Sequence, residues 1–471
     1  MLRKSISAAF AGVILSASGA YAMETDMHDW RLGVQCWTFK NFTLFEAIDK
    51  TRSLGLTWLE AYPGQSISAD IQEKFTPEIS ADIRRKVKQK LDEAGIRLVN
   101  FGVYQLPNNE ETARKAFEFA RETGIETIVS EPPFEAIGML DGLCQEYEIR
   151  LAIHNHPKPS RYWDPQIVLE NCKGTSKWIG ACADTGHWVR SGLDPVECLK
   201  KLEGRIISLH LKEIQDGHDV VWGSGENRVA KILEELHRQN FSGVCSIEHE
   251  KNWENNIPEI RESVRFFNQK YTQLFLDEHE LLDPSGWEDL FEADMGNADF
   301  KPGSWAMENG VLVRKGGGDI WTKAEYGDFI LDLEFKVFEK TNSGVFIRAG
   351  EKVWLPWVEV QISNSAGKPV DRRDTCGAIY DILAPRTNAV LPAGQWNHMV
   401  IKAAGPAVKA VLNDQPIIDM NLDNWKQAHE NPDGSKNKFD IAYKDLPRKG
   451  FIGLQDHGFA VEYRNVKIKE L

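Results

Sequence analysis

The sequence predicts an α/β domain followed by an all-β domain: a closed parallel (β/α)8 barrel and then a β-sandwich of the jelly-roll type. Two observations carry this prediction. Strand-like apolar runs alternate eight times with amphipathic helical stretches between Leu32 and Tyr271, and short alternating strands separated by Gly, Asn, Asp and Pro follow. A chain of 471 residues also exceeds one ordinary core, which favours two or three domains.

The barrel is expected over residues 30–272. A helix over Ile79–Ala94 stops before Gly95, a residue typical of helix ends. An open doubly wound sheet is the alternative, but the segment GVQCWTFKN after the first strand lacks the glycine-rich phosphate loop that such sheets usually carry. The predicted strands are Leu32–Trp37, Thr57–Tyr62, Arg97–Val103, Glu126–Ser130, Arg150–Asn155, Trp178–Ala183, Arg205–Leu211 and Gly243–His249.

Residues 1–22 have the pattern of a signal peptide. Arg3 and Lys4 precede the apolar run Ala8–Ala17, and the small-x-small segment AYA follows as a cleavage site. The apolar run is too short to span a bilayer, and no cysteine for a lipid anchor follows the site. We therefore expect a periplasmic or secreted protein without a membrane anchor.

The sandwich is expected over residues 286–471, after an acidic linker at residues 273–285. Its strands read as short alternating runs, including GVLVRK, SGVFIRAG, WVEVQIS and AVKAVLN. Little helical periodicity interrupts them, and a period of two is typical of antiparallel sheets.

Composition limits the partners. Lys and Arg total 56 against 70 Asp and Glu, a net charge of −14 that disfavours nucleic acid and anionic membranes. Fifteen Trp residues suit a carbohydrate partner, although a Trp-rich core explains the same count. Seven cysteines without a CxxC spacing favour neither a zinc cluster nor a disulfide framework. The oligomeric state is left open.

Acids and histidines end the predicted barrel strands. Asp184, His210 and Glu248 each close an apolar run on a different late strand, so their side chains are expected at one rim. Carboxylates and imidazoles that converge there suit a divalent metal ion. A lone acid at a strand end is usually solvated or caps a helix, but several at successive ends favour a shared site. The same rim carries Glu60, Glu131, His154, His156, His187 and Glu250.

Four motifs in the first domain, LAIHNHP, ADTGHW, SLHLKE and SIEHE, resemble the sugar phosphate isomerase/epimerase superfamily, the xylose isomerase-like TIM barrels. The resemblance covers Leu32–Tyr271. It implies a divalent ion, commonly manganese, magnesium, zinc or cobalt, held by two glutamates, an aspartate and a histidine.

Asp184, His210 and Glu248 match three of the ligands that the resemblance implies. Many members carry the remaining glutamate on the fifth strand, where this chain has the segment HNH. The fourth ligand is therefore either Glu131 from the fourth strand or a histidine, with His156 the candidate.

Such a site supports proton abstraction next to a carbonyl group. Glu248 or Glu250 is the candidate base, and Lys212 or His187 the candidate acid. His210 and Lys212 are two residues apart and are expected on one side of their strand. Candidate substrate contacts at the same rim are Glu60, His154 and Trp188.

The second domain resembles the 3-keto-disaccharide hydrolase domain, a concanavalin-like jelly roll, in segments such as NSGVFIRAG, WVEVQIS and GFIGLQDHGFAVEYRNVKI. The resemblance implies action on glycosides whose glucose unit is oxidised at C3. Polar residues inside apolar strands usually face solvent, but as a group they are candidates for a sugar-binding groove. The candidates are Trp321, Arg348, Glu359, Gln361, Tyr380 and His457, with Trp354 and Trp357 nearby.

Together these observations favour an exported, metal-dependent enzyme that cleaves 3-keto-glycosides by removing the C2 proton and eliminating the C1 leaving group, with net hydrolysis. The alternative is a sugar isomerase or epimerase with an attached carbohydrate-binding sandwich. A sugar-binding surface protein is a third, non-enzymatic hypothesis, which the set of strand-end ligands disfavours. The sequence leaves open whether the sandwich is catalytic.

Overall fold

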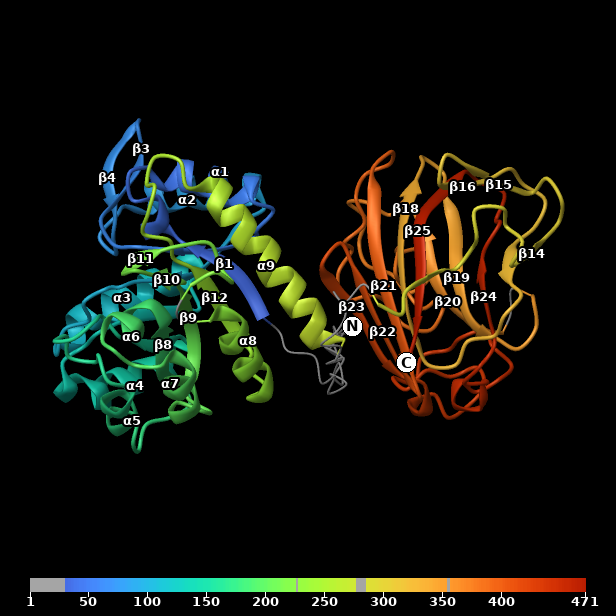
Figure 1. Ribbon diagram of the computed structural model, residues 1–471. Helices are drawn as coiled ribbons and strands as arrows, with labels where there is room; N and C mark the ends of the chain where they lie inside the picture. The colour runs from blue at the N-terminus through green and yellow to red at the C-terminus, as the bar shows by residue number, and fades with distance from the viewer. Residues whose placement is uncertain (1–29, 226–227, 277–284, 354–355) are drawn as a thin grey trace, which may run out of the picture.

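A computed structural model describes residues 30–225, 228–276, 285–353 and 356–471. The predicted signal peptide, most of the predicted linker and Trp354 lie outside these residues. Figure 1 shows two lobes, with the α9 helix running from the first toward the second. Within the described residues, no helix is long and apolar enough to cross a bilayer.

The first lobe is a closed, wholly parallel eight-stranded barrel, which confirms the predicted fold. Every predicted strand overlaps an observed one. The barrel closes where β1 pairs with both β12 and β2. In spatial order its strands are β1 (Trp30–Gln35), β12 (Gly243–Ile247), β9 (Ile206–Leu211), β8 (Ile179–Asp184), β7 (Arg150–His154), β6 (Thr127–Ser130), β5 (Arg97–Phe101) and β2 (Trp58–Ala61).

Helices surround the barrel, and their apolar faces form one core with the outer strand residues. The predicted helix at Ile79 starts at Ala81, because the Ser80 side chain caps it, and Gly95 ends it at φ 68°. The helices are α1 (Leu44–Ser53), α2 (Ala81–Ala94), α3 (Glu110–Thr123), α4 (Ile137–Tyr147), α5 (Pro165–Asn171), α6 (Thr185–Arg190), α7 (Pro195–Lys201), α8 (Val229–Arg238) and α9 (Ile257–Phe275), with 3-10 turns η1 (Cys36–Phe39) and η2 (Phe134–Ala136).

Two small hairpins extend from the barrel loops. The first follows β2 and pairs β3 (Gln65–Ser68) with β4 (Ile71–Phe75). The second follows β9 and pairs β10 (Ile214–Gln215) with β11 (His218–Asp219). The second hairpin brings Asp219 to the carboxyl-terminal rim, where active sites of such barrels lie.

The second lobe consists of two antiparallel sheets, as predicted. The larger sheet contains β15 (Trp305–Glu308), β16 (Val311–Arg314), β25 (Val461–Glu470), β18 (Phe329–Val337), β21 (Trp396–Ala404), β22 (Ala407–Leu412) and β23 (Gln415–Asn421), with β13 (Glu288–Asp289) paired to β25. The smaller sheet contains β14 (Ala298–Phe300), β17 (Ile320–Thr322), β24 (Phe451–Leu454), β19 (Asn342–Ala349) and β20 (Val358–Ser363). The 3-10 turns η3 (Leu422–Asn424) and η4 (Tyr443–Asp445) complete the lobe.

Alternation along β20 sets the two faces of the smaller sheet. Val358, Val360 and Ile362 belong to the core between the sheets. Glu359 and Gln361 therefore project from the outer face, away from the larger sheet.

The outer face of the larger sheet contacts the end of α9. Phe275 and Leu276 form a small cluster with Ile330, Val400 and Val411. The ammonium groups of Lys402 and Lys409 also donate to the carbonyl oxygens of Leu276 and Phe275, at 2.7 and 2.9 Å. Part of the predicted linker is thus the last turn of a helix that joins the lobes.

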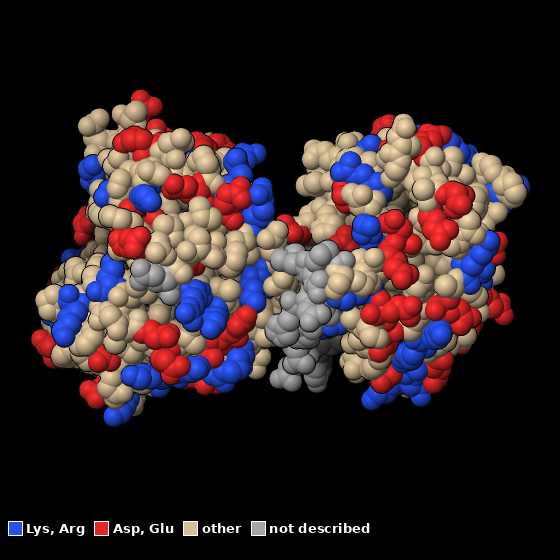
Figure 2. Space-filling view, viewed as in Figure 1, with Lys and Arg blue, Asp and Glu red and all other residues tan. Residues whose placement is uncertain are grey.

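The sandwich adjoins the amino-terminal end of the barrel. A cavity there is lined by the starts of β1 and β2 on one side and by sandwich residues 386–391 and 413–416 on the other. The barrel rim that carries the acids and histidines is the opposite end. On the face seen in Figure 2, acidic and basic side chains are interspersed on both lobes.

Candidate active sites

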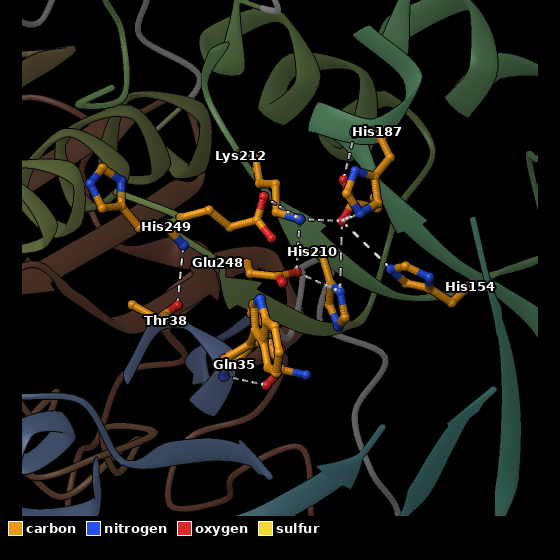
Figure 3. Close-up of polar contacts among 12 residues, drawn as sticks. Gln35, Thr38, His154, His187, His210, Lys212, Glu248 and His249 are labelled. Atoms are coloured by element: carbon orange, nitrogen blue, oxygen red, sulfur yellow. Dashed lines mark hydrogen bonds and ion pairs between the residues drawn. The ribbon is translucent and has the colours of Figure 1, made fainter. Parts of the chain in front are cut away.

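The carboxyl-terminal rim of the barrel surrounds a cavity of about 360 Å³. Loops after different strands contribute its walls, so residues far apart in sequence meet there. In Figure 3, His210, Lys212 and Glu248 converge, with His154 and His187 beside them. The lining residues include Trp37, Tyr62, His154, His156, His187, His210, Glu248 and Glu250.

The two carboxylate oxygens of Asp184 have different partners: one caps a helix, and the other contacts Lys212 and His154. Its Oδ1 accepts the backbone N–H of His187 at 2.7 Å and so caps α6. Its Oδ2 lies 2.8 Å from the Lys212 ammonium and 3.5 Å from Nε2 of His154. Burial opposes ionisation, but the Lys212 ammonium and the hydrogen bond with His154 hold the pKa of Asp184 well below its usual value. The helix cap therefore leaves the second charged oxygen, Oδ2, for Lys212 and His154.

His210 connects Glu60 to the cavity. Its Nε2 lies 2.8 Å from Oε1 of Glu60, a carboxylate buried beneath the cavity floor. Its Nδ1 lies 2.9 Å from Oε2 of Glu248, yet both atoms lack a hydrogen bond of acceptable geometry. Burial opposes protonation, but Cys182, Glu60 and Glu248 raise the pKa of His210 well above its usual value. Nδ1 therefore faces the carboxylates as a proton carrier or a metal ligand.

Lys212 is fully buried among acids. Its ammonium lies 2.8 Å from Asp184, 3.1 Å from Glu248 and 3.8 Å from Glu250. Desolvation opposes its charge, but these acids raise the pKa of Lys212 above its usual value. As the alternation along the strand predicts, Lys212 and His210 contact the same acids.

Glu131 forms a second cluster with two histidines. One oxygen, Oε1, lies 3.1 Å from Nδ1 of His154 and 2.5 Å from Nδ1 of His156. Burial raises the pKa of the Glu131 carboxyl, and the hydrogen bonds from both rings outweigh this effect and lower it. Both candidates for a fourth ligand thus contact each other, with His154 between them and Asp184.

The rim residues fit a divalent cation. Asp184, His210 and Glu248 bring one ligand atom each within 4.8 Å of one another, and all three are buried. Glu60 accepts a hydrogen bond from Nε2 of His210, and this arrangement leaves Nδ1 of His210 to coordinate a metal. Nδ1 of His210 and Oε2 of Glu248 are close but poorly aligned for a hydrogen bond. This geometry is better suited to two ligands that bind the same metal ion.

Arg190, at the end of α6, connects three rim loops. One nitrogen, Nη1, lies 3.1 Å from Nδ1 of His187 and 2.8 Å from Glu250. The other, Nη2, donates to Asp219 on β11 at 2.8 Å. Burial raises the pKa of the Asp219 carboxyl to about 6. Burial also lowers the pKa of His187 well below its usual value.

A second cavity, of about 270 Å³, opens on the outer face of the smaller sandwich sheet. Burial raises the pKa of its Glu359 carboxyl to about 8. Gln361 donates to Asn342 at 2.9 Å, while the amide oxygens of Gln361 and Gln455 are buried without a partner. Such atoms are available to sugar hydroxyls. The lining residues are Asp319, Asn342, Glu359, Gln361, Tyr380, Gln455, Asp456 and His457.

Four predicted substrate contacts lie elsewhere. Glu60 is wholly buried under His210, and Trp188 packs in the barrel core with 1% of its surface exposed. Trp321 stacks on Phe346 at 5.2 Å instead of lining the sandwich cavity. Arg348 donates to the carbonyl oxygens of Gly327 and Gly405 and pairs with Asp328, so it braces a loop junction. These four side chains contact other parts of the protein and do not line either cavity.

The sequence alone does not single out several residues of the two cavities and their surroundings. Arg190 lies one helical turn after His187, and that spacing is a usable signal for a shared face. Asp319, Asn342 and Gln455 come from three separate segments, and only the pairing of β17, β24 and β19 brings them together. Each of the seven cysteines is buried and carries a free thiol.

A parallel barrel with buried carboxylates and imidazoles at its carboxyl rim, joined to a sandwich with a polar cavity, has the cavities and perturbed titratable groups of an enzyme. Comparison with known proteins specifies the class. Residues 48–270 match the xylose isomerase-like TIM barrel family, and residues 271–469 match the family described as the 3-keto-alpha-glucoside-1,2-lyase-like domain. The chain therefore joins one domain of each family, which confirms both resemblances.

The chain is also similar to individual proteins. A 3-keto-disaccharide hydrolase of Bacteroides thetaiotaomicron is 25% identical over 232 residues, 40% of this chain and 80% of that protein. The crystal structure of an uncharacterised protein from Parabacteroides distasonis is 37% identical, covers 51% of this chain and 99% of its own, and has a TM-score of 0.44. A D-tagatose 3-epimerase-like protein is 20% identical, covers 52% and 98%, and has a TM-score of 0.43.

Proposed function

We propose that the sandwich cavity cleaves 3-keto-glycosides. The observation that carries this proposal is Glu359, a buried carboxyl in that cavity whose pKa burial raises to about 8. A carboxylate of this basicity is suited to removing a carbon-bound proton near neutral pH. The family of residues 271–469 and the name of the Bacteroides relative support the substrate class.

The reaction follows from the position of the ketone. A carbonyl at C3 acidifies the C2–H bond, and Glu359 takes that proton. The electron pair left at C2 forms a C1=C2 double bond while the C1–O bond breaks, and the departing oxygen acquires a proton. Water then adds its hydroxyl to C1 and a proton to C2, which completes net hydrolysis. His457 and Tyr380, which also line the cavity, are the proposed partners of the leaving group.

The barrel rim is proposed to carry out a different reaction, proton transfer beside the carbonyl of a free sugar. The observation that favours it is the buried set Asp184, His210 and Glu248. These residues would hold a divalent cation, with Glu131 or His156 as the fourth ligand. When bound, such an ion polarises a carbonyl oxygen and a neighbouring hydroxyl. Mn, Zn, Mg and Co remain the candidates.

The side chains around this set supply the proton chemistry. Glu248 or Glu250 is the proposed base, and both carboxylates line the cavity. Lys212 and His187 are the proposed donors to substrate oxygens. This reaction is the isomerase or epimerase alternative raised by the sequence, now confined to one domain.

The two assignments are tested in the full chain with Glu359→Gln and Asp184→Asn. We expect Glu359→Gln to abolish aglycone release from a 3-keto-glucoside, while Asp184→Asn and chelation leave it within about threefold of wild type. We expect Asp184→Asn, but not Glu359→Gln, to abolish solvent-deuterium incorporation into free ketoses. Aglycone release that persists in Glu359→Gln and disappears on chelation would instead assign cleavage to the barrel.

Export is proposed on the pattern of residues 1–22 alone. Periplasmic or secreted location predicts that the mature protein begins at Met23 in the exported fraction. Cell fractionation and N-terminal sequencing check this, and a full-length cytoplasmic product would contradict it.

A further inference from the structure

Arg190 restricts what His187 is able to do. An arginine guanidinium has only N–H donors, and its nitrogen Nη1 lies 3.1 Å from Nδ1 of His187. Two donors cannot share this contact, so Nδ1 must accept and carries no proton. The ring proton of a neutral His187 is then on Nε2.

The nitrogen that carries the proton faces the site. Nε2 of His187 lies 3.5 Å from Oδ2 of Asp184, and the residue lines the rim cavity. The same guanidinium nitrogen donates to Glu250 at 2.8 Å, which holds a carboxylate beside the ring. Asp219 accepts a 2.8 Å hydrogen bond from Nη2 and so holds the other end of the guanidinium.

We infer that Arg190 is a positioning residue that fixes His187 as a neutral Nε2–H donor toward substrate and holds Glu250 next to it. Its catalytic part rests on the proposed function of the barrel rim. In this state Nε2 has no lone pair for a cation, so His187 is excluded from the metal set that includes His154 and Asp184. The cation is left to Asp184, His210 and Glu248.

The tautomer is measured directly, without turnover. The full chain is labelled with 15N-histidine, and His187→Gln identifies the His187 signals. Spectra are recorded after chelation and after loading with zinc. In wild type we expect an unprotonated Nδ1 and a protonated Nε2 under both conditions. In Arg190→Met we expect the Nδ1 signal to move toward the protonated position, and Arg190→Lys should restore it in part.

Arg205→Met is the matched control. Arg205 is also a half-buried barrel arginine, but it donates to the backbone carbonyls of Ser176 and Ile179. We expect its loss to leave the His187 signals unchanged. A protonated Nδ1 in wild type, or identical His187 signals in wild type and Arg190→Met, would overturn the inference.

A kinetic measurement tests the catalytic part. Removing a positioned proton donor typically costs about 10²-fold or more in rate. We expect Arg190→Met to lower kcat for deuterium exchange by about 10²-fold, with KM changed less than about threefold, and Arg190→Lys to recover part of kcat. If kcat is unaffected while the tautomer changes, the proton-donor role is refuted. If wild type shows no exchange, the barrel function fails and the spectra still decide the tautomer.

Discussion

Oε1 of Glu60 lies 2.8 Å from Nε2 of His210, although 150 residues separate them in the chain. Glu60 is wholly buried and also contacts Gln35, Asn100 and Ser246. Strand β2 therefore supplies a support for the proposed ligand from the barrel interior. A carboxylate behind a metal-binding histidine orients the ring and raises its basicity.

Glu60→Gln should weaken metal binding. The amide removes the charge behind His210 with little change of volume, and loss of such a support typically costs about 10–100-fold in affinity. Titration calorimetry with zinc on the chelator-treated chain measures it. Glu126→Gln, which removes an exposed partner of Arg31, is the control and should bind as wild type does. Equal affinities for both variants would contradict the support role.

Lys212→Met should strengthen metal binding. The ammonium shares Asp184 and Glu248 with the proposed cation, so its positive charge repels a divalent ion a few ångströms away. We expect affinity to rise by roughly 10-fold or more in calorimetry, while the chelated variant becomes less stable because buried acids lose their counter-ion. Lys200→Met, on the exposed side of α7, should change neither value. Weaker binding in Lys212→Met would refute the competition.

Glu359 should make the stability of the sandwich depend on pH. Its pKa in the folded protein, about 8, lies above the ordinary glutamate value of 4.5, so folding favours the protonated acid. The stabilisation that protonated Glu359 adds to the free energy of unfolding is fully present below about pH 4.5 and is lost as pH rises toward 8. Between pH 5 and 8, wild type should therefore lose roughly 2–4 kcal/mol relative to Glu359→Gln in urea unfolding.

Aglycone release should show the opposite trend to stability. The base must be ionised to accept the C2 proton, so kcat/KM should increase with pH up to about 8 and then level off. A profile that levels off near pH 5 would assign the proton transfer to another group. Glu339→Gln, at an exposed position, should keep the wild-type stability and rate profiles.

Trp321→Ala should affect stability more than sugar binding. The ring is 4% exposed, stacks on Phe346 and covers Gly453, where a Cβ atom would meet it at 2.5 Å. Truncation should cost about 3–5 kcal/mol of unfolding free energy. Tyr380→Ala, in the cavity lining, should instead weaken binding of a 3-keto-glucoside. Isothermal titration of both variants separates the roles, and lost binding in Trp321→Ala with normal stability would contradict them.

Sequence periodicity predicts most of the fold because one apolar run per strand and one amphipathic stretch per helix are local signals. It also places Asp184, His210 and Glu248 at one rim, since parallel barrel strands all end there. Periodicity does not specify how deep below the cavity floor a side chain at a strand end lies. A register shift between Leu59 and Glu60 in the β2–β5 pairing lies where Glu60 sits below the cavity floor.

Long-range partners explain the other differences. Trp321 and Arg348 have the pattern of groove residues, but Phe346, Gly453 and Gly405 come from other strands and loops. Arg190 contacts Asp219 because the β10–β11 hairpin brings Asp219 to the rim. Such partners depend on tertiary packing, which a single strand's alternation does not encode.

The order of layers along the molecule determines how small molecules reach the barrel cavity and the sandwich cavity. The barrel, the end of α9, the larger sheet, the core and the smaller sheet follow one another, and the Glu359 cavity opens beyond them. The barrel rim faces the other way. A compound leaving one cavity must therefore cross bulk solvent to reach the other, where diffusion and competing proteins act on it. Covalent linkage thus keeps the two cavities in equal numbers at opposite ends of the molecule.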